Sequence, residues 1–72
     1  MAVLTLLSRP YCHLCEEMAA ALRSLGIAVT EVDIDADPRL EELYGEHIPV
    51  LLKDGVELCR HRLTPEAIAK LG

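Results

Sequence analysis

The sequence contains no tryptophan and no phenylalanine, and two tyrosines are its only aromatic residues. The hydrophobic content is nevertheless 51%, so the core has to be built from Leu, Val, Ile and Ala side chains. Such a core leaves few aromatic surfaces on which a ligand could stack. A chain of 72 residues also has no room for a second hydrophobic core, and we therefore expect one domain over residues 1–72.

Basic residues are few as well. Seven Lys and Arg residues stand against twelve Asp and Glu residues, which gives a formal net charge of −5 at pH 7. Nucleic-acid binding depends on clustered Lys and Arg side chains that release counterions. The composition therefore predicts that nucleic acid is not a partner.

The apolar stretch from Ala2 to Leu7 is too short to span a membrane, and it lacks the basic start and the cleavage site of a signal peptide. Three cysteines, two of them closely spaced, do not fit the disulfide framework of a secreted protein. We therefore expect a cytoplasmic monomer without a membrane contact. In a reducing compartment its cysteines would serve catalysis or metal binding.

The first half of the chain predicts a strand, a helix and a second strand. The apolar run Val3–Leu7 is typical of a strand that is buried on both faces in the middle of a sheet. A helix follows from about Cys12 to Gly26. Its apolar residues fall on one helical face: Leu14, Met18, Ala21, Leu22 and Leu25. The β-branched segment Ile27–Ile34 then predicts a second strand, parallel to the first.

The second half predicts a helix, a hairpin and a last helix. Asp37-Pro38 combines a capping residue with a proline at the first helical position. Asp54-Gly55 between the apolar runs 49–52 and 56–59 is typical of a β-hairpin, and Thr64-Pro65 begins the last helix. The predicted fold is α/β, in the order β-α-β-α-β-β-α. Its sheet has four strands and is mixed, with the first strand central and helices on both faces.

Cys12 and Cys15 form a Cys-x-x-Cys pair at the predicted start of the first helix. Unpaired backbone N–H groups and the positive end of the helix dipole stabilise a thiolate there. We predict that Cys12 is the exposed nucleophile and attacks a substrate disulfide. Cys15, nearer to the apolar side marked by Met18 and Leu22, is then the buried residue that resolves the mixed disulfide.

Two other interpretations of this pair remain open. Both cysteines could be small hydrophobic residues of a redox-inert interaction domain. They could also supply half of a zinc site, or bind an iron–sulfur cluster between two chains. Since the chain has no second Cys-x-x-Cys pair, a zinc site would need further ligands that converge in space from Cys59, His13, His47 and His61.

Three further residues each have two interpretations. His13 could lower the pKa of Cys12 as an imidazolium, or it could be an exposed and unengaged loop residue. Pro49 is either the ordinary first residue of a strand or part of a cis peptide bond. Cys59 lies in an alternating strand on the face shared with Glu57, where a packed small residue is favoured over a third redox centre.

Taken together, these motifs resemble the glutaredoxin-like branch of the thioredoxin superfamily, and in particular a small bacterial family of such proteins. The resemblance covers nearly the whole chain. The matching segments are Tyr11–Cys15, 25–27, 31–35 and 48–50. It implies a thioredoxin-like fold and a thiol–disulfide oxidoreductase, with a disulfide-containing protein or a small thiol as its substrate.

The resemblance also implies roles for residues around the cysteines. It implies that the Ile48–Pro49 peptide bond is cis and faces Cys12, with the Ile48 backbone able to pair with an extended substrate. Arg9 stands where glutaredoxins carry a lysine that helps to hold the carboxylate of glutathione, and a guanidinium can do this bidentately. Tyr11 and His13, which flank Cys12, complete the predicted substrate-binding residues.

Glutathione is implied as a co-substrate, while we expect no tightly bound cofactor and no metal. Two departures from the glutaredoxin pattern bear on glutathione. His13 replaces the usual proline of the active-site motif, and Cys59-Arg60 stands where glutaredoxins have a Gly-Gly pair that lets glutathione approach the backbone. The sequence therefore predicts thiol–disulfide exchange and leaves its dependence on glutathione open.

Overall fold

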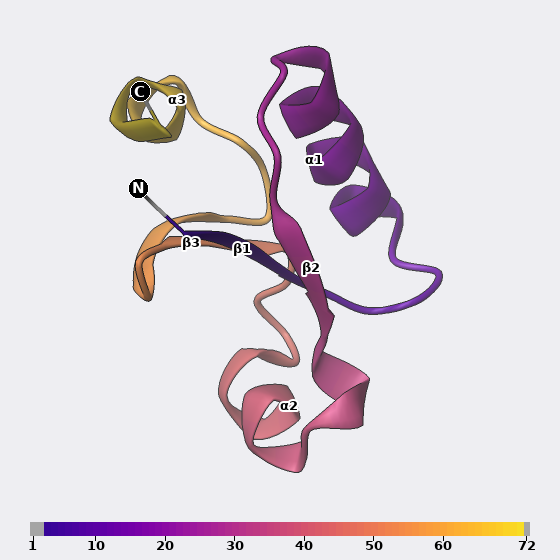
Figure 1. The fold of residues 1–72 in the computed structure, drawn as a ribbon. Coiled ribbons are helices and arrows are strands. Elements are labelled where there is room, and N and C mark those ends of the chain that lie inside the picture. Colours follow the sequence, from indigo (N-terminus) through magenta and orange to yellow (C-terminus); the bar gives the residue numbers. More distant parts are fainter. Residues whose placement is uncertain (1–2, 72) are drawn as a thin grey trace.

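The computed structural model describes residues 3–71 (Figure 1). Residues 1, 2 and 72 of the predicted domain, and with them the predicted apolar residue Ala2, lie outside the described residues. The predicted order of strands and helices is confirmed, with one short 3-10 helix, η1, in addition. The elements are β1 (Leu4–Ser8), α1 (His13–Ser24), β2 (Thr30–Asp33), η1 (Ile34–Ala36), α2 (Pro38–Tyr44), β3 (Val50–Lys53), β4 (Val56–Arg60) and α3 (Pro65–Leu71).

The four strands form one mixed sheet in the order β2-β1-β3-β4. β1 runs parallel to β2 and antiparallel to β3, and β3 is antiparallel to β4. β1 is therefore central, as predicted. Its neighbouring residues Leu6 and Leu7 are 0% and 2% exposed and belong to different core clusters, which confirms burial on both faces. With three helices around this sheet, the expected thioredoxin-like fold is confirmed.

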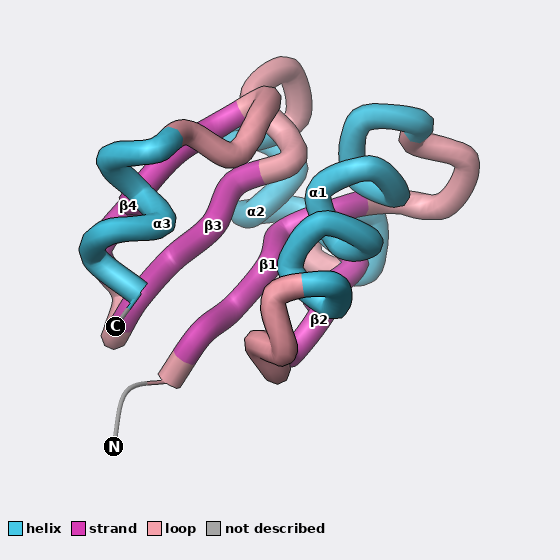
Figure 2. The backbone as a smooth tube through the Cα atoms, turned by 90° about the horizontal axis from the view of Figure 1, so that it is seen from above, coloured by secondary structure: helices cyan, strands magenta, loops and turns pink. Residues whose placement is uncertain are grey.

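The helices lie on both sides of the sheet. α1 and α3 cover one face and α2 covers the other (Figures 1 and 2). The first core contains Leu6, Met18, Leu22, Leu51, Cys59 and Ala67. The second core contains Leu7, Cys15, Ile34, Ile48 and Val50. Both are aliphatic apart from their cysteines and a methionine, as the composition predicts.

α1 begins and ends where the sequence predicts. Cys12 is its N-cap and Gly26 follows its C-cap with φ +74°. The Gly26 N–H donates to the Arg23 carbonyl at 3.0 Å and the Ile27 N–H donates to the Leu22 carbonyl at 2.9 Å, which is the Schellman arrangement. The helix therefore stops at a residue that has no Cβ to strain the left-handed backbone.

The apolar face of α1 is narrower than predicted. Leu14 and Leu25, at the two ends of the predicted face, are exposed. The buried residues of the helix are Cys15, Met18 and Leu22. The first and last turns still reach the cores, but through Cys15 and Leu22 and not through the leucines at the two ends of the predicted face.

β2 is shorter than the predicted segment Ile27–Ile34. Ile27 and Val29 pack against the first core before the strand begins at Thr30. At the other end the Asp33 side chain accepts a hydrogen bond from the Asp35 N–H at 2.9 Å and starts η1. Local side-chain capping therefore ends the strand at Asp33.

The hairpin contains the predicted turn and an unpredicted bulge. Asp54 and Gly55 have φ values of 52° and 83°, as a type I′ turn requires. Leu51 pairs with Cys59 whereas Leu52 pairs with Glu57, so Leu58 is an extra residue in β4. The bulge reverses the side-chain alternation beyond it.

The bulge corrects one prediction. Cys59 does not share a face with Glu57. It lies opposite Leu51 and is buried in the first core, whereas Glu57 lies opposite Leu52, on the face that α2 covers. Strict alternation along β4 was the wrong assumption.

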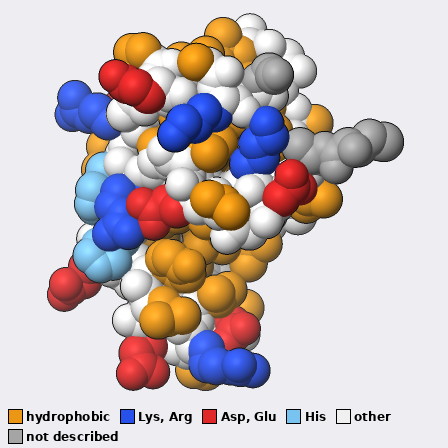
Figure 3. All heavy atoms as spheres, turned by 90° about the vertical axis from the view of Figure 1, so that its left-hand side faces the viewer, with side chains coloured by type: hydrophobic (Ala, Val, Ile, Leu, Met, Phe, Trp, Pro, Cys, Tyr) orange, Lys and Arg blue, Asp and Glu red, His pale blue; other side chains and the backbone are white. Residues whose placement is uncertain are grey.

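On the face of the molecule shown in Figure 3, acidic and basic side chains are interleaved around exposed hydrophobic side chains.

Within residues 3–71, none of the helices has the length and the apolar character needed to span a membrane.

We predict that Gly26→Ala lowers the free energy of unfolding by about 1–2 kcal/mol, because an L-residue is strained in the left-handed region. A Cβ at Gly26 would meet no atom within 4 Å, so the loss would arise from the backbone and not from a clash. Urea denaturation of the oxidised protein measures it. Gly26→Asn serves as the control and should lose less, since Asn tolerates this conformation. Equal stability of wild type and Gly26→Ala would contradict the prediction.

Candidate active site at the start of α1

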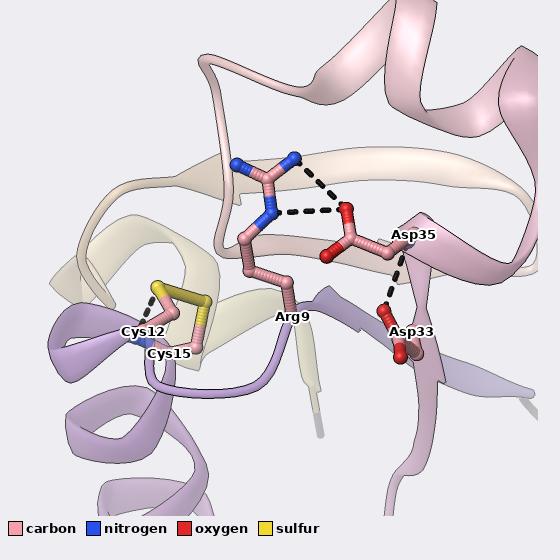
Figure 4. Close-up of polar contacts among 5 residues, drawn as sticks. All are labelled: Arg9, Cys12, Cys15, Asp33 and Asp35. Atoms are coloured by element: carbon pink, nitrogen blue, oxygen red, sulfur yellow. Dashed lines mark hydrogen bonds and ion pairs between the residues drawn. A yellow bond between two sulfur atoms is a disulfide. The ribbon is translucent and has the colours of Figure 1, made fainter.

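The Cys-x-x-Cys pair forms the first turn of α1. Cys12 and Cys15 are joined by a disulfide, with their Cα atoms 5.2 Å apart (Figure 4). The Cys15 N–H donates to the Cys12 Sγ at 3.3 Å, and the Glu16 N–H donates to the Cys12 carbonyl at 3.0 Å. The Cys12 sulfur therefore takes the place of an N-capping oxygen. After reduction, the same N–H group and the helix dipole would stabilise a thiolate on Cys12.

The predicted order of exposure is confirmed. Cys12 is half-buried, and Cys15 is only 3% exposed. The reason differs from the predicted one, because Cys15 does not pack with Met18 and Leu22. It belongs to the second core, with Leu7 and Ile48 among its neighbours. The helix thus directs its first buried residue to one face of the sheet and the following ones to the other.

The loop before β3 lies next to the cysteines. The Ile48–Pro49 peptide bond is cis, as the resemblance implied. Ile48 is buried in the same core as Cys15, and the half-buried Cys12 packs against that core. The Pro49 carbonyl accepts a hydrogen bond from the His61 N–H at 2.8 Å, which ties this loop to the end of β4. The structure therefore brings Ile48 and the two cysteines together.

Tyr11 precedes the nucleophile in an unusual conformation. Its φ is +63° and the residue is 100% exposed. A left-handed backbone at a bulky residue stores strain, and such strain clusters at functional sites. The aromatic ring is therefore presented to solvent immediately before Cys12.

Arg9 is engaged by a carboxylate of the protein itself. Its Nε and Nη2 atoms lie 3.2 Å and 3.1 Å from Asp35 Oδ1. Figure 4 shows the guanidinium turned towards Asp35 and away from the two sulfur atoms. The ion pair joins the loop after β1 to η1. A role of Arg9 in holding a substrate carboxylate stays a prediction.

His13 is exposed and lies on the outer side of α1. Its Nε2 atom is 3.1 Å from Glu17 Oε1, one helical turn further on. His13 is therefore exposed, as the second interpretation predicted, but it is not unengaged, because Glu17 lies within contact distance. Its predicted influence on Cys12 stays a prediction.

Two pairs of residues near the end of β4 were not predicted from the sequence. Arg60 donates from Nε and Nη2 to the two carboxylate oxygens of Glu57, both at 2.7 Å, and these hydrogen bonds lower the pKa of Glu57. His47 and His61 lie with their ring centroids 6.4 Å apart. Residues three apart in a regular strand point to opposite faces, so only knowledge of the Leu58 bulge could have predicted the first pair.

Cys59 is separate from the dithiol. It is a free, buried cysteine in the first core, and burial raises its pKa. This confirms that it is a packed small residue. Within residues 3–71, no group of three or more His, Cys, Asp or Glu side chains is placed to hold a metal ion.

A family model for the glutaredoxin-like domain (DUF836) matches residues 3–71. The chain belongs to the glutaredoxin-like family. A solved structure is similar over almost the whole length: the solution NMR structure of protein Ne2328 from Nitrosomonas europaea. It is 35% identical in sequence, with a TM-score of 0.85 over 96% of this chain and 88% of that chain. No curated protein is significantly similar to the chain.

Membership of the glutaredoxin-like family confirms the resemblance and the fold. A glutaredoxin-like domain with a Cys12–Cys15 pair at disulfide distance is consistent with a redox role. The family itself is defined by its domain and not by an activity, so the reaction has to be argued from the site.

We predict that the raised pKa of Cys59 makes stability depend on pH in the alkaline range. Unfolding would expose the thiol and return it to its ordinary pKa of about 8.5. Stability linked to this group is fully present below that value and is lost as the pH rises, because the unfolded state then binds fewer protons. The slope should not exceed about 1.4 kcal/mol per pH unit.

Urea denaturation between pH 7 and 10 tests this in a Cys12→Ser, Cys15→Ser background, where disulfide exchange is absent. The matched control adds Cys59→Ala. The protein with Cys59 should lose free energy of unfolding, relative to the Cys59→Ala control, as the pH rises above the ordinary pKa of a thiol, about 8.5. A difference that is constant with pH would show that burial does not hold the Cys59 thiol in its neutral form.

Proposed function

We propose that the protein is a dithiol oxidoreductase that reduces disulfides through Cys12 and Cys15. The Cys12 thiolate attacks one sulfur of a substrate disulfide, whose S–S bond breaks as the other sulfur leaves as a thiolate. The Cys15 thiol then loses its proton and attacks Cys12 Sγ, which releases the second substrate sulfur. Two electrons pass to the substrate, and its two thiolates take up one proton from Cys15 and one from the solvent.

The observation that carries this proposal is the unequal environment of the two sulfurs. The half-buried Cys12 receives the Cys15 N–H at a helix N-terminus, whereas Cys15 is buried within disulfide distance of it. A structural disulfide needs no such asymmetry. In an exchange reaction, the exposed sulfur attacks and the shielded one waits until a mixed disulfide has formed.

The predicted substrate-binding residues fit this reaction. Ile48 shares a core with Cys15, and its peptide bond to Pro49 is cis, which would leave the Ile48 backbone free to pair with an extended substrate. Tyr11 and His13 flank Cys12 on the exposed side. Arg9 would act on an anion only by leaving or sharing Asp35.

The reductant that restores the dithiol is a thiol, and glutathione is one candidate. The side chains that replace the Gly-Gly pair of glutaredoxins lie on opposite faces: Cys59 in the first core and Arg60 against Glu57. Arg60 is therefore held in place and stays beside the end of β4. A side chain held there would obstruct the approach of glutathione to the backbone. As to the substrate, this favours a disulfide-containing protein over glutathione.

We predict that Cys12→Ser abolishes the reduction of a disulfide substrate such as insulin, because no other exposed thiol can start the exchange. Cys15→Ser should also stop turnover, but it should accumulate a covalent mixed disulfide between Cys12 and the substrate. Turnover is followed by insulin precipitation and the adduct by intact-mass spectrometry. Cys59→Ala is the control and should keep turnover near wild type. Retention of turnover in Cys12→Ser would refute the assignment.

We further predict that Cys12 is alkylated as a thiolate at a lower pH than an ordinary cysteine. A Cys15→Ser, Cys59→Ala variant leaves Cys12 as the only thiol, so that its rate of reaction with iodoacetamide against pH reports its pKa. The same variant unfolded in urea supplies the ordinary value. Identical titrations of the folded and unfolded protein would remove the helix N-terminus as the source of reactivity.

A further inference from the structure

A groove lies between α1 and the segment 61–63 that follows β4. We name it the α1 groove. It has a volume of about 180 Å³, which is enough for a side chain and not only for a single water molecule. Its apolar lining consists of Leu14, Met18, Ala21 and Leu63.

The strand directions place this groove next to the cysteines. β1 and β4 are both antiparallel to β3, so both end at the same edge of the sheet. The segment 61–63 leaves β4 at this edge, and α1 begins there. Leu14, which lies between the two cysteines in the chain, is exposed and lines the groove. His61 also lines the groove, and its N–H donates to the carbonyl of Pro49, next to Ile48 of the core that holds Cys15. A polypeptide whose sulfur reaches Cys12 would therefore have its neighbouring side chain at the groove.

Arg62 lines one side of the groove. Within residues 3–71 it forms no ion pair, whereas Arg9 pairs with Asp35 and Arg60 pairs with Glu57. Glu17, which also lines the groove, has its Oε1 atom 3.1 Å from His13 Nε2. The groove therefore has an apolar floor, and Arg62 is the one Lys or Arg side chain in its lining, beside Glu17 and His61. An incoming carboxylate could pair with Arg62.

Resting on the proposed oxidoreductase function, we infer that the substrate is an acidic polypeptide. An apolar side chain next to its disulfide cysteine fills the α1 groove, and a carboxylate close by in the same chain pairs with Arg62. The exposed Tyr11, on the other side of Cys12 in the chain, adds an apolar contact. Glutathione does not match this surface, since neither neighbour of its cysteine has an apolar side chain.

Two peptide disulfides test the inference. Both carry a leucine beside the cysteine and differ only in two nearby residues, which are Glu in one and Lys in the other. The fully reduced wild-type protein is mixed with each peptide, and released peptide thiol is quantified after acid quenching. This single-turnover rate needs no added reductant. We expect the acidic peptide to react about three- to ten-fold faster at low ionic strength, and the ratio to fall as salt is added.

Arg62→Gln should lose most of this ratio. Arg23→Gln removes the same charge from the last turn of α1, outside the groove, and should keep the ratio. A third peptide with glycine in place of leucine should react more slowly than its acidic parent in the wild type. Equal rates for the acidic and basic peptides, a faster basic peptide, or an unchanged ratio in Arg62→Gln would overturn the inference.

The neutral disulfide bis(2-hydroxyethyl) disulfide separates this inference from the proposed function. If the wild-type protein reduces it but does not discriminate between the peptides, the substrate inference fails and the oxidoreductase function stands. If the reduced protein reacts with neither the neutral disulfide nor the peptides, the proposed function itself fails.

Discussion

The burial of β1 between two aliphatic cores is the constraint on which the rest of the structure depends. Leu6 faces one core and Leu7 the other, and each buried leucine contributes about 1.5–3 kcal/mol to stability. The chain has no Phe and no Trp, so both cores are mainly aliphatic. Both β1 and β4 run antiparallel to β3, so the chain leaves the central strand β1 at the edge of the sheet where β3 begins and β4 ends. The dithiol, the cis peptide bond and the segment 61–63 meet there for this reason.

The parts of the fold that sequence predicts well are those specified by local chemistry. Asp37 caps α2 by accepting from the Arg39 N–H at 2.9 Å, and Thr64 caps α3 by accepting from the Ala67 N–H at 3.1 Å. Gly26 and Asp54-Gly55 have the positive φ values that their positions suggested. Each of these features depends on residues within one or two turns, so a single sequence contains enough information to find it.

The features that were missed depend on distant contacts. Leu14 continues the apolar pattern of α1 and is nevertheless exposed, because the packing of the helix on the sheet decides which of its apolar residues reach the core. The late start of β2 at Thr30 accompanies the packing of Ile27 and Val29 against the first core. The same holds at the candidate site. The cysteine pair was evident from its spacing, but Arg9 and Asp35 are 26 residues apart in the chain. The Glu57–Arg60 pair needs the bulge at Leu58, for which the sequence contains no distinct signal.

The same bulge decides what becomes of the third sulfur. With regular alternation Cys59 would share the α2 side of the sheet with Cys15, and three thiols would be available for scrambled pairings. The extra residue instead turns Cys59 through to the opposite side, so that the sheet itself separates it from the dithiol. A single backbone irregularity thus keeps Cys59 in a different core from Cys15, so that in the proposed reaction only the Cys12–Cys15 pair would take part in the exchange.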